Sequence, residues 1–144
     1  MNRGRPSLVA RRVLLGLLAA SFVAVSSRAF AGTYLNSAAL LLAQAGNEAN
    51  YLRARINDKE LAELIHKLAN ARLEAAKGML VPKEVVQAHP HLLLVLENYE
   101  RAADAATRGE AEKFLVYQQR ARDEDRTFRG VLKQFGYALP DPKP

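Results

Sequence analysis

Apolar residues recur at alternating spacings of three and four along four stretches of this chain. In the first stretch, residues 34–56, the apolar positions are Leu35, Ala38, Leu42, Ala45, Ala49, Leu52 and Ile56. This heptad spacing places the apolar side chains in one stripe along a helix. Gly46 interrupts the stretch without lying on the stripe, so we predict a single helix here.

The second stretch begins with a capping-box pattern. Asn57-Asp58-Lys59-Glu60 supplies a cap residue with a glutamate three places on, which is typical of a helix start. Gly78 followed by Met79 predicts a left-handed cap at the other end. The residues that we expect to face inward are Leu61, Leu64, Leu68, Ala71 and Ala75.

The third stretch, from Pro82 to Ala106, keeps one phase across Pro90. Its predicted inward residues are Val85, Ala88, Leu92, Val95, Tyr99, Ala102 and Ala106. This continuity favours one helix that is kinked at Pro90, near His89; two helices in series are the alternative.

The fourth stretch runs from Glu110 to Phe135, between breaks at Gly109 and Gly136. Its predicted inward residues are Ala111, Phe114, Gln118, Ala121, Asp125, Phe128, Leu132 and Phe135. Four such helices with short connections predict an all-α fold, an up-down-up-down four-helix bundle over residues 32–137. Residues 138–144 contain three prolines, and we predict a disordered Pro-rich tail there.

The N-terminus has the order of a secretory signal peptide. Basic residues lead into an apolar run of 13 residues, 13–25, and Ser26-Ser-Arg-Ala-Phe-Ala31 follows it. This order predicts a signal peptide over residues 1–31 with cleavage after Ala31. As a helix the apolar run spans roughly 20 Å, less than the ~30 Å of a bilayer core, so an uncleaved anchor is the weaker alternative. We therefore expect an exported bacterial protein, periplasmic or secreted.

Arg11 and Arg12 also resemble a twin-arginine signal, although adjacent arginines are common in basic leaders. The general secretion route is the favoured interpretation, and the twin-arginine route remains open.

The signal peptide changes what the charge of the chain means. The full sequence carries 21 Lys and Arg against 15 Asp and Glu, a formal charge of +6. Five of the arginines and none of the acids lie in residues 1–31, which leaves 16 basic and 15 acidic groups in the rest. A nearly neutral domain removes the main argument for a nucleic-acid partner. Contact with a membrane is expected only through the signal peptide before its cleavage.

Several kinds of chemistry lack the residues that they need. The chain has no cysteine, which excludes disulfides, thiolate zinc sites and covalently attached haem. In size, topology and export the chain resembles the haem-b cytochromes of the periplasm, but their iron ligands, a Met on the first helix and a His on the last, have no counterpart here. Glu63 and His66 have the Glu-x-x-His spacing of di-iron bundles, but only once and on the predicted solvent side. No nucleophile motif or phosphate loop occurs, so we predict a non-enzyme without a cofactor.

His89-Pro90-His91 is the least ordinary local pattern. Two imidazoles with Asp125 could hold a metal ion or a small ligand, which is our alternative functional hypothesis. Counting outward from the predicted turns also places four polar residues at one level of the bundle: Gln44, Asn70, His91 and Asp125. The favoured interpretation is structural, because a metal site usually takes three protein ligands. His91 and Asp125 as an acid–base couple would be a third possibility, but no substrate pocket can be inferred.

Residues 120–129 are a dense run of mixed charge. Acids and bases alternate at helical spacings of three and four, which is typical of a solvated helix face. As a functional surface it would be a docking face with Arg122, Asp123, Arg126 and Arg129. The leading hypothesis is therefore a non-catalytic exported bundle that binds another protein or an envelope component. A dimer also remains open, because heptad stripes can pack between chains.

Overall fold

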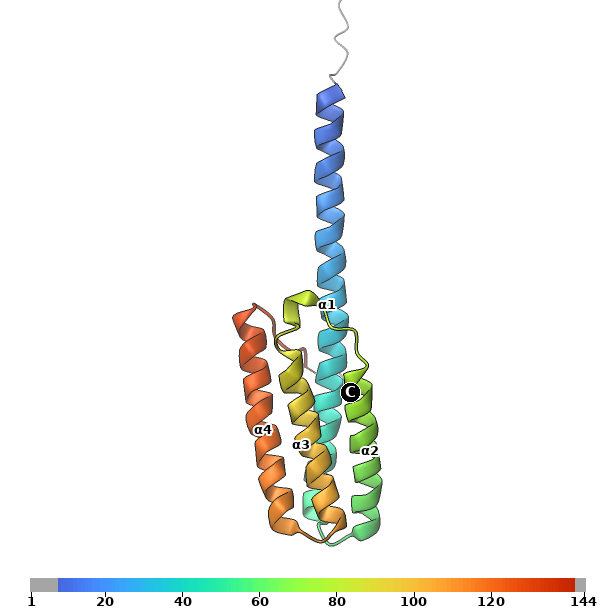
Figure 1. Cartoon of the computed structure of the whole chain (residues 1–144), viewed down its shortest axis with the longest axis vertical. Coiled ribbons are helices and arrows are strands. Elements are labelled where there is room, and N and C mark those ends of the chain that lie inside the picture. Colours follow the sequence, from blue (N-terminus) through green and yellow to red (C-terminus); the bar gives the residue numbers. More distant parts are fainter. Residues whose placement is uncertain (1–7, 142–144) are drawn as a thin grey trace, which may run out of the picture.

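The computed structural model describes the backbone of residues 8–141 and the side chains of residues 28–141. Its elements are α1 (Leu8–Ala54), α2 (Lys59–Lys77), a short 3-10 helix η1 (Lys83–Val85), α3 (His89–Thr107) and α4 (Ala111–Gln134). Consecutive helices run in opposite directions and pack side by side, and the described residues contain no strand (Figure 1). The predicted all-α class and the packing of four helices are confirmed. Most of the predicted signal peptide, residues 1–27, lies outside the described side chains.

The core consists of two groups of buried side chains. The larger group joins all four helices and includes Leu73 of α2, Leu92 and Val95 of α3 and Phe128 of α4. The smaller group lies toward the turn between α3 and α4, around Leu52 and Phe114. Alanines fill most of the remaining buried positions, which allows the helix axes to approach closely. Leu139 also packs against the larger group, so this part of the predicted tail is held on the bundle.

Capping side chains and glycines set the ends of the helices. The cap residue of α2 is Asp58 rather than Asn57, which lies three places before Glu60: Asp58 Oδ1 accepts a hydrogen bond of 3.0 Å from the Leu61 amide. Gly109 and Gly136 follow α3 and α4 with positive φ angles of 72° and 79°, which glycine adopts without strain. The predicted left-handed cap at Gly78 is wrong, because its φ is −85°.

The predicted kink at Pro90 is also wrong. α3 begins at His89, so Pro90 lies in the first turn of that helix. Its missing amide hydrogen disturbs nothing there, since the first turn has no intrahelical acceptor for it. Residues 83–85 form the separate 3-10 turn η1, so the alternative of two helical segments in series is the closer description.

α2 packs against the other helices with a different face from the predicted one. Its buried residues are Ala62, Ile65, Ala69, Arg72, Leu73 and Ala76. The predicted inward residues Leu64 and Leu68 are instead 55% and 43% exposed. Both faces carry apolar residues at heptad spacing, and the one rich in alanine packs against the other helices. Phe135, also predicted inward, is 42% exposed just beyond the end of α4.

We expect Gly46→Ala to stabilise the protein. A Cβ at this position would lie 3.6 Å from the Tyr99 hydroxyl, an ordinary contact, and alanine has the higher helix propensity. The free energy of unfolding in urea should rise by about 1 kcal/mol. Gly130→Ala in α4 is the matched control, because no atom lies within 4 Å of its added Cβ. A loss of stability in Gly46→Ala but not in Gly130→Ala would contradict the distance described here between Gly46 of α1 and the Tyr99 hydroxyl of α3.

Candidate functional site

The candidate functional site is a groove between α1 and α4. α4 packs mainly on α3, and α1 packs on α2 and α3, so α1 and α4 make few direct contacts. The space between them forms an open cavity of about 330 Å³. We call it the α1–α4 groove; it is lined by Ala39, Leu42, Ala43, Gly46, Asn47, Asn50, Val95, Tyr99, Asp125, Arg129, Pro140 and Asp141.

Tyr99 of α3 lines the groove beside Gly46. A Cβ added at Gly46 would lie 3.6 Å from the Tyr99 hydroxyl, so this hydroxyl lies next to the backbone of α1. Burial raises the pKa of Tyr99, the negative charge of Asp125 raises it further, and Arg122 opposes the shift. The hydroxyl therefore stays protonated at neutral pH and is available as a hydrogen-bond donor and acceptor.

Asn50 connects the two walls of the groove. Its Oδ1 accepts a hydrogen bond of 3.2 Å from Gln118 Nε2 and one of 3.1 Å from Arg122, both on α4. The adjacent α4 wall carries the ion pair of Asp125 and Arg129, whose closest atoms are 3.0 Å apart. Amide, hydroxyl, carboxylate and guanidinium groups therefore surround one open space, an arrangement suited to hydrogen bonding with a polar ligand.

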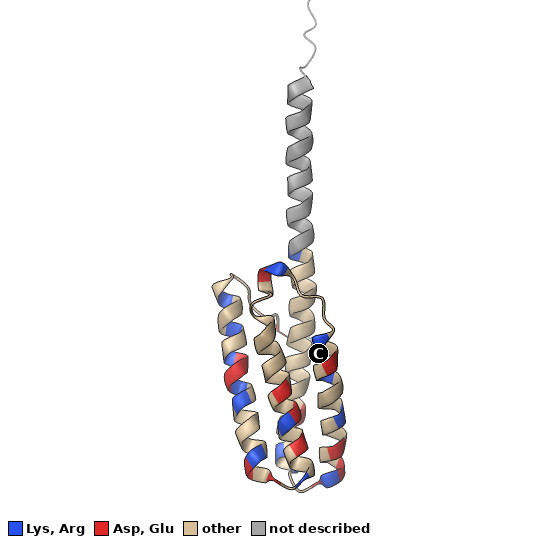
Figure 2. Ribbon diagram, viewed as in Figure 1, with Lys and Arg blue, Asp and Glu red and all other residues tan. Residues whose placement is uncertain are grey.

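The predicted docking face is divided between the groove and the outer surface. Arg129 lines the groove, and Arg122 reaches its edge through Asn50. Asp123 and Arg126 pair with each other on the exposed side of α4. Acidic and basic residues are interspersed over α2, α3 and α4 (Figure 2). A surface of mixed sign does not favour a polyanionic partner.

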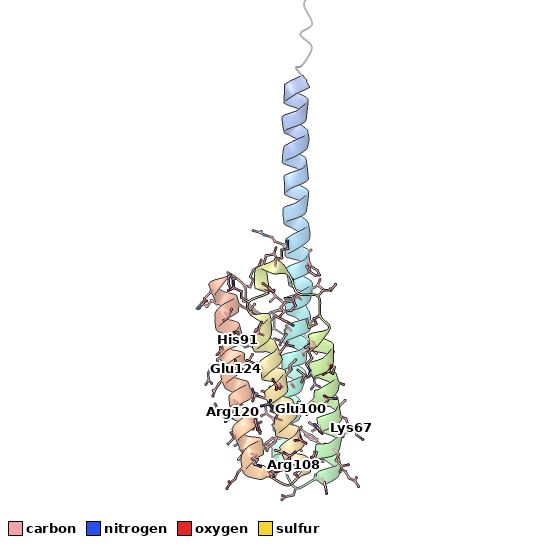
Figure 3. All side chains as sticks on the ribbon, in the orientation of Figure 1. Lys67, His91, Glu100, Arg108, Arg120 and Glu124 are labelled. Carbon is pink, nitrogen blue, oxygen red and sulfur yellow. The ribbon has the colours of Figure 1, made fainter. Side chains whose placement is uncertain are left out.

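The structure does not bring the predicted metal ligands together. His89 Nδ1 lies 3.0 Å from the Tyr34 hydroxyl, whereas His91 Nδ1 lies 3.1 Å from Glu124 Oε2 (Figure 3). Asp125 pairs with Arg129 instead. Across residues whose side chains are described, no three His, Cys, Asp or Glu side chains gather as a metal site would need.

The predicted polar layer across the bundle does not form. Gln44 and Asn70 are exposed on α1 and α2, while His91 and Asp125 are half-buried and have different partners. The prediction considered only the height of each residue along the bundle. A polar layer also requires that all four side chains point into the bundle.

Stability is expected to fall at mildly acidic pH because of His89. Partial burial lowers the pKa of His89 below its usual 6.5. The unfolded chain therefore binds this proton more readily, and the stabilisation present above pH 6.5 is lost as the pH falls through the folded-state pKa. Melting temperatures at pH 7.5 and 5 should differ less in His89→Gln than in the wild type. An equal difference in both proteins would show that His89 does not carry this dependence.

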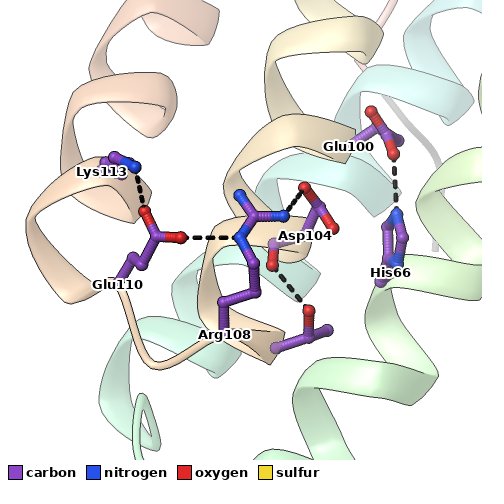
Figure 4. Close-up of polar contacts among 7 residues, drawn as sticks. His66, Glu100, Asp104, Arg108, Glu110 and Lys113 are labelled. Carbon is purple, nitrogen blue, oxygen red and sulfur yellow. Dashed lines mark hydrogen bonds and ion pairs between the residues drawn. The ribbon is translucent and has the colours of Figure 1, made fainter.

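A group of ion pairs lies at the opposite end of the bundle. Arg108 contacts Asp104 of α3 and, at 2.6 Å across the turn between α3 and α4, Glu110, which also pairs with Lys113 of α4 (Figure 4). His66 Nε2 lies 2.7 Å from Glu100 Oε1 on α3. His66 was predicted to face solvent and is instead half-buried, whereas Glu63 is exposed, so the two do not share an inward site. These contacts join helices, and we assign them a structural role.

Tyr99, Asn47 and Asn50 were missed as site residues from sequence. Tyr99 was predicted as core, and neither asparagine belongs to a motif. One available signal was Gly46, because a glycine inside a long helix often marks a close approach by another group.

Comparisons with family models, with curated proteins and with solved structures each gave no match for this chain. Among the described residues, no helical segment has the length and hydrophobicity needed to cross a membrane.

Proposed function

We propose that this protein is an exported, non-catalytic helical bundle that binds a segment of another protein in the α1–α4 groove. The observation that carries the proposal is the lining of that groove. Asn47, Asn50 and the Tyr99 hydroxyl offer donors and acceptors, and the pair of Asp125 and Arg129 adds both charges. Backbone amides and mixed-charge side chains of a polypeptide complement this set of groups.

The α4 surface extends the proposed binding site. Arg122 and Arg129 adjoin the groove, and the pair of Asp123 and Arg126 lies on the exposed side of the same helix. A partner segment in the groove would thus meet the charged surface that the sequence indicates as a docking face. The exposed ion pairs contribute little to stability, so they are free to exchange partners on binding.

The burial pattern around residue 31 supports a boundary between the signal peptide and the bundle. Residues 28–30 are exposed, whereas Ala31 is 1% exposed and Tyr34 is 3% exposed. Packing against the rest of the protein thus starts at Ala31, the last residue before the expected cleavage site. Ala31 is also part of α1, where a peptidase cannot bind it as an extended strand. Cleavage before folding, as in the general secretion route, fits this burial better than export of a folded chain.

A photo-crosslinking amino acid at position 47 tests the groove directly. In cells that export the protein, we expect one discrete protein adduct from position 47 and none from position 113, an exposed α4 site that does not line the groove. Arg129→Glu, which removes the positive charge from the groove wall, should abolish the adduct while leaving the amount of exported protein unchanged. The same adduct from both positions, or none from position 47, would contradict the proposal.

A further inference from the structure

α2 carries a second apolar stripe that is largely exposed, with only its first residue, Leu61, partly buried against the smaller core group. It consists of Leu61, Leu64, Leu68, Ala71 and Ala75, which we call the α2 stripe. Leu64 and Leu68 are 55% and 43% exposed, and both alanines are exposed. The spacings along the stripe alternate three and four, which is the repeat of a coiled-coil seam. α2 already uses a different face to pack within the bundle, so the stripe is surplus to the fold of one chain.

The contacts of α2 on either side leave this stripe free for a partner. Arg72 reaches α1 through a bond of 2.7 Å to Glu48, and His66 reaches α3 through Glu100. The stripe lies outside both contacts. The α1–α4 groove has no lining residue from α2, so a partner on the stripe would leave that groove open.

The sizes of the side chains identify the partner as a second copy in antiparallel orientation. The large residues occupy the first half of the stripe, and the small residues occupy the second half. Gly78 follows three residues after Ala75, the last residue of the stripe. An antiparallel copy places Leu64 opposite Ala75 of the second copy and Leu68 opposite Ala71 of the second copy. Leu61 then meets Gly78. A parallel copy would set leucine against leucine and leave the alanine half unfilled, so it would pack less closely.

The charges beside the stripe agree with the same register. Lys67 points outward from α2 (Figure 3), and Glu74 lies two turns further along the same edge. The antiparallel register that matches large with small residues also places Lys67 beside Glu74 of the second copy. The twofold axis repeats this pair, as an isologous interface requires. In a parallel dimer, Lys67 would lie opposite Lys67 of the second copy and Glu74 opposite Glu74, so the pairing of opposite charges would be lost.

We propose that the protein forms a twofold-symmetric dimer through an antiparallel contact between the α2 stripes of two copies. The stripe is short, so it buries less than the ~1,200–2,000 Å² of a standard interface and gives a weak dimer. Dissociation in the range of about 10–100 µM is expected for such a contact. This proposal rests on α2 and does not depend on what the groove binds.

Sedimentation equilibrium of the exported protein from about 1 µM to 1 mM tests the dimer. We expect the wild type to pass from monomer to dimer over this range. Lys67→Glu and Glu74→Lys should each weaken dimerisation several-fold, and the double variant should restore it. Glu112→Lys, an exposed charge reversal on α4 rather than α2, is the control and should leave dimerisation unchanged. A wild type that stays monomeric to 1 mM, or a double variant no better than the single ones, would overturn the proposal.

Ala71→Leu separates specific packing from general hydrophobic association. In the antiparallel register the added side chain collides with Leu68 of the second copy, so dimerisation should weaken by about tenfold. Non-specific association through the stripe would strengthen instead, because the surface becomes more apolar. A stronger dimer would therefore overturn the proposed register. Circular dichroism at 1 µM checks that the exposed substitution leaves the monomer folded.

Discussion

Leu52→Ala is expected to lower the free energy of unfolding by about 2–5 kcal/mol, whereas Leu64→Ala should change it by less than about 0.5 kcal/mol. The sequence placed both leucines on inward stripes at heptad positions. In the structure Leu52 is fully buried at 0% exposure, and Leu64 is 55% exposed. Truncation at position 52 removes buried methyl groups and leaves a cavity, while truncation at position 64 removes atoms that already contact water.

Urea unfolding monitored by circular dichroism measures both changes. The protein should be kept near 1 µM, so that any dimer formed through the α2 stripe is dissociated and does not add to the stability of the wild type. Similar losses for Leu52→Ala and Leu64→Ala would mean that α2 is rotated relative to the structure described here.

Glu48→Ala is expected to destabilise the protein by about 3 kcal/mol, because it leaves the buried guanidinium of Arg72 without its partner. The Arg72 side chain is 8% exposed, and its bond of 2.7 Å to Glu48 joins α2 to α1. The second oxygen of Glu48, Oε2, is buried without a hydrogen-bond partner, so the pair is incompletely compensated. Replacing both residues with apolar ones should therefore cost less than removing one of them.

A double-mutant cycle with Glu48→Leu and Arg72→Leu measures this coupling. The double variant should be more stable than the sum of the two single losses predicts, by more than about 1 kcal/mol. Strictly additive losses would show that Glu48 and Arg72 do not interact in solution.

The breaks around α2, α3 and α4 could be predicted because local chemistry sets them, although Gly78 does not form the predicted left-handed cap. Asp58 caps α2 through its own neighbour Leu61, and Gly109 and Gly136 adopt the positive φ angles that follow α3 and α4. Each of these signals acts within a few residues, so it is visible in the sequence. Pro90 was misinterpreted because the heptad phase continues across it, while the backbone uses proline where it costs least, in the first turn of α3.

The rotation of α2 and the groove could not be predicted from local patterns. α2 has two apolar faces, and the choice between them depends on how closely alanine allows α1 and α3 to approach. The groove depends on the separation of α1 and α4, and Asn50 meets Gln118 and Arg122 across 68 and 72 residues of sequence. Asp125, which was predicted to lie beside His91, pairs with Arg129 instead.

We propose that residues 1–31 direct export and that the functional bundle begins at Gly32. The intact mass of the protein recovered from the periplasm of a bacterial host tests this claim most directly. We predict the mass of residues 32–144, a chain of 113 residues, and expect Ala29→Arg to block processing because the peptidase requires a small residue there. A full-length mass starting at Met1, or recovery of the protein only from the cytoplasm, would contradict the account.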